Sequence, residues 1–350
     1  MKFTTSEMRD AAKMLGLFVP NRSPLPSAEC IYIEAKADGV VWLRTSDPMG
    51  AASAMMIHAD VSEPGAAFVN AKTLVAVLGK VGDEVEVDAD GKICTITNGD
   101  TEVTLSVLSD EFNKPMHVDG EPVFVSAEQF CEIVSGVTFA AAGDASIHSG
   151  AKFEASAGTL TVACLDGYRA AVRSCAVEGA DGSFVIPSKL LTELAKIVTE
   201  EVKIFHSPKS VRIQTGALNV TVPQLQGDFL QWRNAIPAAE KTVVKGAKND
   251  FLKKIDLLNA VNDQKKPIVL KFSGDVCVMN IQTTTSAIKD KIGVDMTGED
   301  VTIGFNPRFL SDAIKAAGDE IEIHLNGALS PITIKGDGFL YLVLPVKVKE

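Results

Sequence analysis

The sequence predicts an α+β fold of three similar domains, each built from two helices packed on largely antiparallel sheets. One pattern occurs three times: an apolar strand end, a turn or cap residue, a cation, and a helix with an apolar face. Its copies are Val69–Leu74, Ile186–Leu191 and Phe305–Leu310. An alternating strand follows each copy, and such strands fit a sheet that is half buried.

The spacing within and between the copies supports this prediction. Eleven residues separate the helix leucine from the first strand aliphatic each time: Leu74 from Val85, Leu191 from Val202, and Leu310 from Ile321. The three leucines lie 117 and 119 residues apart. A period of this length is a domain that buries its own core, not a solenoid repeat.

Two helices are expected in each domain, and several have clear start signals. Ser6 and Ser126 stand where N-caps belong, and Pro307 suits the first helical position. The expected helices are Ser6–Leu15, Ala71–Lys80, Ser126–Val137, Ser188–Val198, Lys248–Val261 and Pro307–Ala317.

Short strands fill the remainder of each domain, about eight per domain. In the first domain they include Cys30–Ala35, Val40–Arg44, Ile93–Thr97 and Val103–Val107, separated by hairpin turns such as Asn98-Gly99. Linkers near Val118–Pro122 and Pro237–Glu240 divide the chain into domains 1–120, 121–238 and 239–350.

Composition indicates an ordinary globular protein, with 46% hydrophobic and 23% charged residues. No apolar run approaches a membrane span, and the first residues lack a signal-peptide core. We therefore expect a cytoplasmic protein that does not bind membranes. Six cysteines are scattered without a CxxC pair and are interpreted as buried small hydrophobes.

The distribution of charge is more informative than its sum. The net charge of −11 argues against a nucleic-acid partner at first sight. However, the six expected helices sum to +3 and the remainder to −14. The second helix of each domain is basic. One basic helix is ordinarily a solvated face, but the same pattern in three equivalent helices is unusual. If these helices line one surface, that surface attracts phosphates.

Catalytic motifs are absent from the sequence, and we predict no metal and no cofactor. The five histidines lack metal-ligand spacing, and there is no GxSxG, Walker or GxGxxG motif. The cluster Asp166–Arg169 has three interpretations: a turn whose arginine pairs with a carboxylate, an interaction surface, or a catalytic centre. At the C-terminus Pro345 interrupts an apolar strand, Leu340–Val348, which indicates an edge or irregular segment near the surface.

The whole chain resembles a bacterial-type beta sliding clamp, the processivity subunit of DNA polymerase III. The similarity rests on the order and spacing of several short motifs together with the threefold repeat. The motifs are Met1–Thr4, Arg22–Pro26, Asp166–Ala171, Gly227–Phe229, Ile303–Asn306 and Tyr341–Lys347.

This resemblance implies a clamp fold that closes into a ring. Two chains would pair head to tail around duplex DNA, with no sequence specificity and no chemistry of their own. The dimer interface would include Val103, Leu105 and a position near Val261. Arg22, Lys72 and Lys189 match positions that approach the DNA backbone, whereas the loop Gly143–Ser146 departs from the family pattern.

The resemblance also implies a pocket for a short apolar peptide. Its partners would be the catalytic subunit of DNA polymerase III, the clamp loader and other proteins that carry a clamp-binding motif. Ala170 and Ala235 are smaller than the usual aliphatic residues, and Leu165 replaces a polar one. The matching positions are Leu165, Gly167, Tyr168, Arg169, Ala170, Leu230, Ala235, Asn306, Phe309, Leu329, Pro331, Leu342, Leu344, Pro345, Val346 and Lys347.

Two other functions remain open at this point. One is a hydrolase or transferase on duplicated domains, with Asp166 and Arg169 in a cleft. The other is a peptide-binding scaffold unrelated to DNA. A clamp needs basic helices in all three domains, whereas an enzyme needs an extra polar constellation in one of them, and the sequence shows none.

Overall fold

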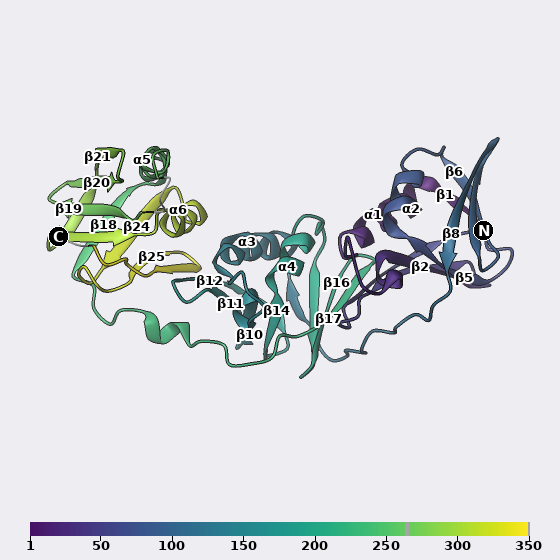
Figure 1. The fold of residues 1–350 in the computed structure, drawn as a ribbon. Coiled ribbons are helices and arrows are strands. Elements are labelled where there is room, and N and C mark those ends of the chain that lie inside the picture. The colour runs from purple at the N-terminus through teal and green to yellow at the C-terminus, as the bar shows by residue number, and fades with distance from the viewer. Residues whose placement is uncertain (263–265, 349–350) are drawn as a thin grey trace. The chain divides into compact units, whose positions relative to one another are not determined.

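The computed structural model describes residues 1–262 and 266–348 (Figure 1). The chain divides into two compact units. Unit 1 consists of Met1–Phe130, Glu178–Ala180 and Glu193–Gln224. Unit 2 consists of Cys131–Val177, Asp181–Thr192 and Leu225–Glu350.

Among the described residues there are six α-helices, two from each third of the chain. They are α1 (Thr5–Gly16), α2 (Ala71–Leu78), α3 (Ala127–Val137), α4 (Ser188–Leu194), α5 (Lys248–Asn259) and α6 (Pro307–Ala316). Four short 3₁₀ helices accompany them: η1 (Pro26–Glu29), η2 (Thr138–Ala140), η3 (Ile147–Ser149) and η4 (Trp232–Ala235).

Unit 1 is built on one antiparallel sheet with the strand order β1-β6-β7-β8-β5-β2-β3-β4-β17-β16-β15-β9-β13. The pairing of β4 with β17 makes it continuous, because Ser53 lies opposite Val220. Its strands are β1 (Lys2–Thr4), β2 (Cys30–Ala35), β3 (Val40–Ser46), β4 (Ala52–His58), β5 (Gly65–Asn70), β6 (Glu84–Ala89), β7 (Ile93–Asn98), β8 (Thr101–Leu108), β9 (Val123–Val125), β13 (Glu178–Gly179), β15 (Val202–His206), β16 (Ser210–Thr215) and β17 (Leu218–Pro223).

Unit 2 holds two antiparallel sheets. The larger has the order β14-β10-β11-β12-β26-β25-β24-β18-β22, and the smaller has the order β21-β20-β19-β23. Their strands are β10 (Gly150–Ser156), β11 (Thr159–Leu165), β12 (Arg169–Ala176), β14 (Gly182–Pro187), β18 (Thr242–Ala247), β19 (Ile268–Ser273), β20 (Val276–Gln282), β21 (Ala287–Gly293), β22 (Asp295–Gly298), β23 (Val301–Phe305), β24 (Glu320–Leu325), β25 (Ile332–Gly336) and β26 (Phe339–Val343).

The helices bury one apolar face each and cover the sheets. In α1, Met8, Ala12 and Leu15 are fully buried, and they recur at the helical spacing of three to four residues. Strand β3 alternates, with Val41 and Leu43 buried. Burial of these faces stabilises the fold by about 25 cal/mol for each Å² of apolar surface removed from water.

The predicted threefold repeat is confirmed at the level of single residues. The three leucines of the repeat, Leu74, Leu191 and Leu310, lie in α2, α4 and α6 and are completely buried. Their partners Val85, Val202 and Ile321 lie in β6, β15 and β24 and are buried as well. The same 11-residue step therefore separates a buried helix leucine from a buried strand aliphatic three times.

Some expected boundaries were wrong, for local reasons. Helix α4 ends at Leu194 instead of Val198, because the segment Ile197-Val198-Thr199 is β-branched and disfavours helix. Ser6 lies inside α1 and does not cap it; the N-cap is Thr4. Ser126 does cap α3, since its Oγ accepts from the N–H of Gln129 at 3.2 Å.

The last strand ends at Val343, before Pro345 and not across it. Strand β26 is also not at an edge, because it pairs with β12 on one side and β25 on the other. The irregular segment that Pro345 predicted is the tail beyond Val343, whose Val346 N–H donates to the carbonyl of Gly304 at 2.8 Å.

Four of the six cysteines are buried, as expected, while Cys131 and Cys175 are half-buried. Burial raises the pKa of the Cys94 thiol to about 11 and that of Cys277 to about 12, so both stay protonated. No helix within residues 1–262 and 266–348 is long and apolar enough to cross a membrane.

Candidate functional site

A tight turn between β11 and β12 begins the candidate site. Gly167 has φ +86°, a left-handed conformation that favours glycine. The carboxylate of Asp166 closes the turn, because its Oδ1 accepts from the backbone N–H of Tyr168 at 3.0 Å and of Arg169 at 3.1 Å. The turn therefore fixes the orientation of Arg169, the first residue of β12.

The Arg169 guanidinium is only 6% exposed and is fully engaged. Its Nε donates to Asp166 Oδ2 at 3.0 Å, and its Nη1 donates to Asp312 Oδ2 on α6 at 2.6 Å. Its Nη2 donates to the carbonyl of Phe139 at 2.5 Å, and its Cζ lies 4.5 Å from the ring centre of Phe309. Arg169 thus joins β12 to α6, and Asp166 is occupied by this pairing and by the turn.

Beside this turn lies a cavity of about 290 Å³, entirely within unit 2. Its walls are mainly apolar and come from β11, β12, β26 and the segment around η4. The lining residues are Leu165, Gly167, Arg169, Ala170, Leu230, Gln231, Trp232, Asn234, Ala235, Leu342 and Leu344.

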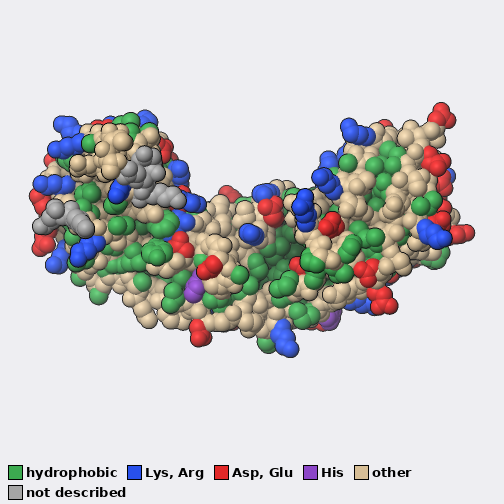
Figure 2. Space-filling view, viewed as in Figure 1, with side chains coloured by type: hydrophobic (Ala, Val, Ile, Leu, Met, Phe, Trp, Pro, Cys, Tyr) green, Lys and Arg blue, Asp and Glu red, His purple; other side chains and the backbone are tan. Residues whose placement is uncertain are grey.

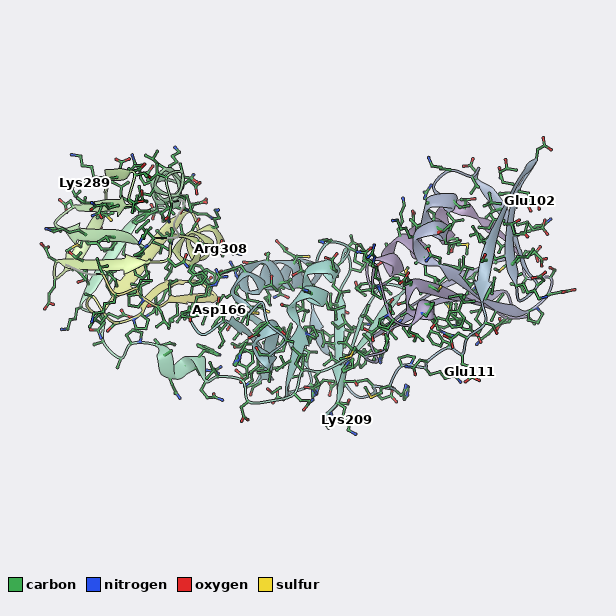
Figure 3. The ribbon with its side chains drawn as sticks, in the orientation of Figure 1. Glu102, Glu111, Asp166, Lys209, Lys289 and Arg308 are labelled. Atoms are coloured by element: carbon green, nitrogen blue, oxygen red, sulfur yellow. The ribbon has the colours of Figure 1, made fainter. Side chains whose placement is uncertain are left out.

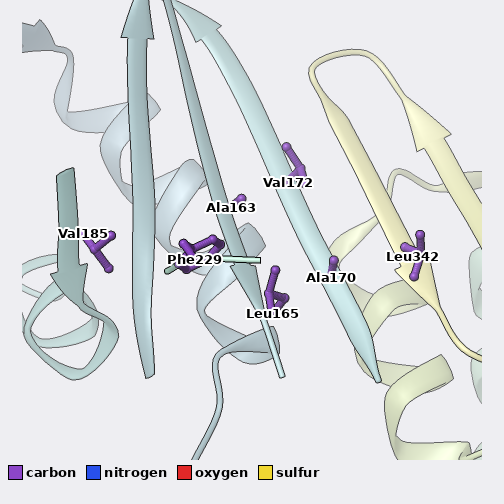
Figure 4. Packing of buried hydrophobic residues seen from close by; sticks show 7 residues of the cluster. All are labelled: Ala163, Leu165, Ala170, Val172, Val185, Phe229 and Leu342. Carbon is purple, nitrogen blue, oxygen red and sulfur yellow. The ribbon is translucent and has the colours of Figure 1, made fainter. Parts of the chain in front are cut away.

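The floor of the cavity is part of a packed hydrophobic core. Leu165, Ala170 and Leu342 belong both to the lining and to a cluster that also holds Ala163, Val172, Val185 and Phe229 (Figure 4). Because β12 and β26 pair directly, with Ala170 opposite Leu342, the floor is a continuous sheet surface. A floor of this kind keeps its shape with or without a ligand.

The lining residues Gln231, Trp232 and Asn234 are missing from the sequence prediction. They lie between the predicted residues Leu230 and Ala235, on or next to η4. Arg233 fixes this wall, since its Nη1 donates to Glu154 Oε2 at 2.9 Å and its Cζ lies 4.3 Å above the Trp232 ring. The signal available in the sequence was Trp232 itself, one of two tryptophans in the chain.

Eight of the sixteen predicted pocket residues line the cavity, and the other eight lie elsewhere. Tyr168 is 64% exposed and stacks on Phe309, with ring centres 6.2 Å apart. Asn306 caps α6, where its Oδ1 accepts from the Arg308 N–H at 3.0 Å. Pro345, Val346 and Lys347 belong to the tail, and Leu329 and Pro331 to the loop between β24 and β25.

The three predicted DNA contacts are all exposed side chains. Arg22 lies in the loop before η1, and Lys72 and Lys189 lie in the first turns of α2 and α4. Within residues 1–262 and 266–348, no carboxylate lies within ion-pair distance of any of them. A cation in the first turn opposes the helix dipole, so this repeated placement costs helix stability. Such a cost favours a function for these charges.

The predicted dimer residues lie on two elements. On β8, Val103 is half-buried and Leu105 is buried. Val261 is half-buried in the turn after α5. Strand β8 pairs with β7 over residues 101–106 and with β5 at Val107 and Leu108, so the second edge of residues 101–106 is open in the described chain.

Comparison with known proteins covers both the sequence and the fold. A model of the DNA polymerase III beta subunit, central domain, matches residues 124–231, and a model of its C-terminal domain matches residues 233–346. Together these segments are more than half of the chain. This chain belongs to the DNA polymerase III beta subunit family.

Relatives and solved structures of this family match the chain from end to end. A beta sliding clamp of Chlamydia muridarum is 24% identical over 370 residues, with 100% of each chain covered. A sliding clamp structure from Bacillus subtilis has a TM-score of 0.93 at 22% identity, covering 99% of each chain. A clamp from Pseudomonas aeruginosa bound to griselimycin has a TM-score of 0.92 at 18% identity, also covering 99% of each. The predicted clamp fold is therefore confirmed.

Proposed function

We propose that this chain is a DNA sliding clamp, a processivity factor of the DNA polymerase III replicase. The observation that carries this conclusion is the match to beta sliding clamps along the full chain, in sequence and in fold. Two copies join head to tail and close a ring around duplex DNA. The ring acts by topology and catalyses no reaction itself.

The domain limits 1–120, 121–238 and 239–350 remain part of this proposal. The family matches to residues 124–231 and 233–346 support them. Each of the three domains supplies two helices, and the second helix of each has a cation as its second residue: Lys72, Lys189 and Arg308. The cations of these helices and Arg22 would contact the DNA backbone, and the protein would act in the cytoplasm.

Weak phosphate contacts suit such a ring better than tight ones. A protein that grips base edges stops at one sequence, whereas one that neutralises phosphates through mobile lysine side chains moves along the duplex. The exposure of Lys72 and Lys189, and their lack of carboxylate partners in the described chain, support this role.

The cavity beside Arg169 is the proposed docking site for a short apolar peptide. Its volume of about 290 Å³ and its apolar floor fit a few apolar side chains, with Gln231 and Asn234 available to orient a peptide backbone. The similar clamp solved bound to griselimycin supports ligand binding by this fold. The partners would be the polymerase catalytic subunit, the clamp loader and other proteins that carry the motif.

The catalytic alternative has little support from the geometry. An acid–base or nucleophilic role needs a carboxylate that can reach a substrate. Asp166 instead accepts from two backbone N–H groups and from Arg169, whose other donors are bound to Asp312 and Phe139.

Retention on DNA tests the proposal. The chain is loaded with a clamp loader on circular duplex DNA, freed of unbound protein, and followed before and after the circle is cut. A topological link predicts stable retention on circles and rapid loss after cutting. Retention that survives linearisation would contradict the proposal.

A pocket variant tests the peptide site. Ala235 lines the cavity and is exposed, so Ala235→Arg fills the opening without disturbing the core. We expect the affinity for a polymerase-derived clamp-binding peptide to fall at least about tenfold. A tenfold loss corresponds to about 1.4 kcal/mol of binding free energy. The matched control is Ala239→Arg, an exposed alanine that does not line the cavity. Equal affinities of the two variants would exclude this cavity as the site.

A further inference from the structure

The dipeptide Asn-Gly occurs twice in the sequence, at Asn98-Gly99 and at Asn326-Gly327. Asparagine before glycine is prone to spontaneous deamidation, in which the glycine nitrogen attacks the asparagine side chain. Glycine favours this attack because it has no side chain to obstruct its backbone nitrogen. Both asparagines are half-buried, so exposure does not distinguish them. A difference in their reactivity therefore has to come from the fold around each pair.

The fold holds the amide of Asn98 at both of its polar atoms. The Nδ2 of Asn98 donates to the carbonyl of Glu84, and its Oδ1 accepts from the N–H of Gly82 at 3.3 Å. Asn98 is also the last residue of β7 and pairs with Thr101 across the hairpin. The side chain of Asn98 can turn toward the Gly99 nitrogen only after these hydrogen bonds break.

Carboxylates surround the same hairpin. Asp100 directly follows the Asn-Gly pair, and Glu102, labelled in Figure 3, lies opposite Thr97. In Figure 2, acidic side chains predominate over this end of unit 1. The attacking group in deamidation is a deprotonated backbone nitrogen, and nearby negative charge disfavours such an anion. Charge and hydrogen bonding therefore both protect Asn98.

Asn326 stands in a different environment, in the loop between β24 and β25 of unit 2. In the part of the chain that the structure describes, the side-chain amide of Asn326 has no hydrogen-bond partner. Gly327 has φ +88°, and no atom beyond its chain neighbours lies within 4 Å of the place that a Cβ would take. The sequence from Leu325 to Ile334 has no charged residue. Neither hydrogen bonds nor neighbouring carboxylates in this loop oppose the attack.

We propose that Asn326 is a site of spontaneous deamidation in the folded chain, whereas Asn98 is protected. The Gly327 nitrogen bonds to the Cγ of Asn326, the Cγ–Nδ2 bond breaks, and ammonia leaves with the proton of the Gly327 N–H. Water then opens the cyclic imide at either carbonyl and leaves aspartate or isoaspartate. The reaction takes up water, releases ammonia and changes no oxidation state. It does not depend on the proposed function.

The modification changes the surface of unit 2 as the protein ages. Either product adds a carboxylate to a stretch of sequence that otherwise has no charge. Isoaspartate also leads the main chain through the former side chain, which lengthens the loop by a methylene group. The same loop carries Leu329, which is 77% exposed, and Pro331. The loop that ages thus includes two of the predicted peptide contacts.

Mass spectrometry of the aged full-length chain tests the inference. The folded protein is incubated in mildly alkaline buffer, and deamidation at each asparagine is followed with time. We expect Asn326 to react at least about tenfold faster than Asn98, which corresponds to about 1.4 kcal/mol of activation free energy. In urea the hydrogen bonds of Asn98 are lost, so the two rates should converge. Equal rates in the folded chain, or a difference that persists in urea, would overturn the inference.

A matched pair of variants provides an independent readout. Asn326→Gln and Asn98→Gln each keep an amide but lengthen the side chain, so the attack needs a larger ring and becomes much slower. On isoelectric focusing, the wild-type chain and Asn98→Gln should gain an acidic form at similar rates, and Asn326→Gln should not. Circular dichroism confirms that both variants are folded. An acidic form that appears in Asn326→Gln at the wild-type rate would show that the modified residue is not Asn326.

Discussion

At the scale of single residues, Arg169 is the centre of the candidate site. One side chain closes a turn with Asp166, reaches α6 through Asp312 and packs against the ring of Phe309. Lysine could not replace it, because a single ammonium group cannot serve three acceptors in the plane of a guanidinium. The wall of the cavity therefore depends on one buried cation.

Removal of this cation should be costly. Arg169→Ala removes the buried cation that lies between the partly buried carboxylates of Asp166 and Asp312. We expect the free energy of unfolding of unit 2 to fall by about 3 kcal/mol. Urea denaturation followed by fluorescence of Trp232 measures the change. The control is Arg308→Ala, whose exposed side chain lies 3.8 Å from the same Asp312 and should cost under about 0.5 kcal/mol. If the free energy of unfolding falls by a similar amount in both variants, the burial of Arg169 does not contribute to stability.

At the scale of elements, the second helix of each third of the chain shows how function and stability compete. Helices α2 and α6 are capped by Asn70 and Asn306, whose side chains accept from Thr73 and Arg308. The same first turns carry Lys72 and Arg308, which oppose the helix dipole. The caps offset that cost and let a cation stand at the start of the helix.

Removal of a cap tests this balance. Asn306→Ala should destabilise unit 2 by about 1 kcal/mol, the usual cost of removing an N-cap. Ser6→Ala should change little, because Ser6 lies inside α1 and makes no cap. Thermal unfolding of both variants measures the difference. A larger effect from Ser6 than from Asn306 would contradict the assignment of the caps.

At the scale of the whole molecule, the net charge of −11 is unevenly distributed, and the proposed contact with DNA depends on this segregation of charge. The exposed cations at the starts of α2, α4 and α6 recur once per domain, and the acidic residues lie mainly outside the helices. In the proposed ring of two chains, these cations occur six times, so many weak contacts with DNA phosphates replace any single tight one.

Neutralising two of these cations should shorten the residence of the ring on DNA. In Lys72→Ala/Lys189→Ala, dissociation from circular duplex DNA should be faster and should depend less on salt, because the log–log slope falls by about 0.9 for each phosphate that is no longer neutralised. Peptide binding at the Arg169 cavity should be unchanged. The control Lys196→Ala removes a lysine that already pairs with Glu193 at 2.7 Å. An unaltered salt slope in the double variant would argue against these DNA contacts.

The sequence by itself determined the elements and their repetition. Period, charge and cap residues are local properties, so the buried leucines Leu74, Leu191 and Leu310 and the Ser126 cap could be predicted from spacing alone. The family motifs added the residues that form the floor of the cavity, Leu165, Ala170 and Leu342.

Tertiary structure alone decided which distant segments meet. Pairing of β12 with β26, the wall made by Trp232, and the open edge of β8 depend on strand partners far apart in the chain. A strand's sequence shows its buried face, but its hydrogen-bonding edges carry no side-chain signal. Partner choice is set by packing over the whole sheet, and it becomes visible only when the chain is folded.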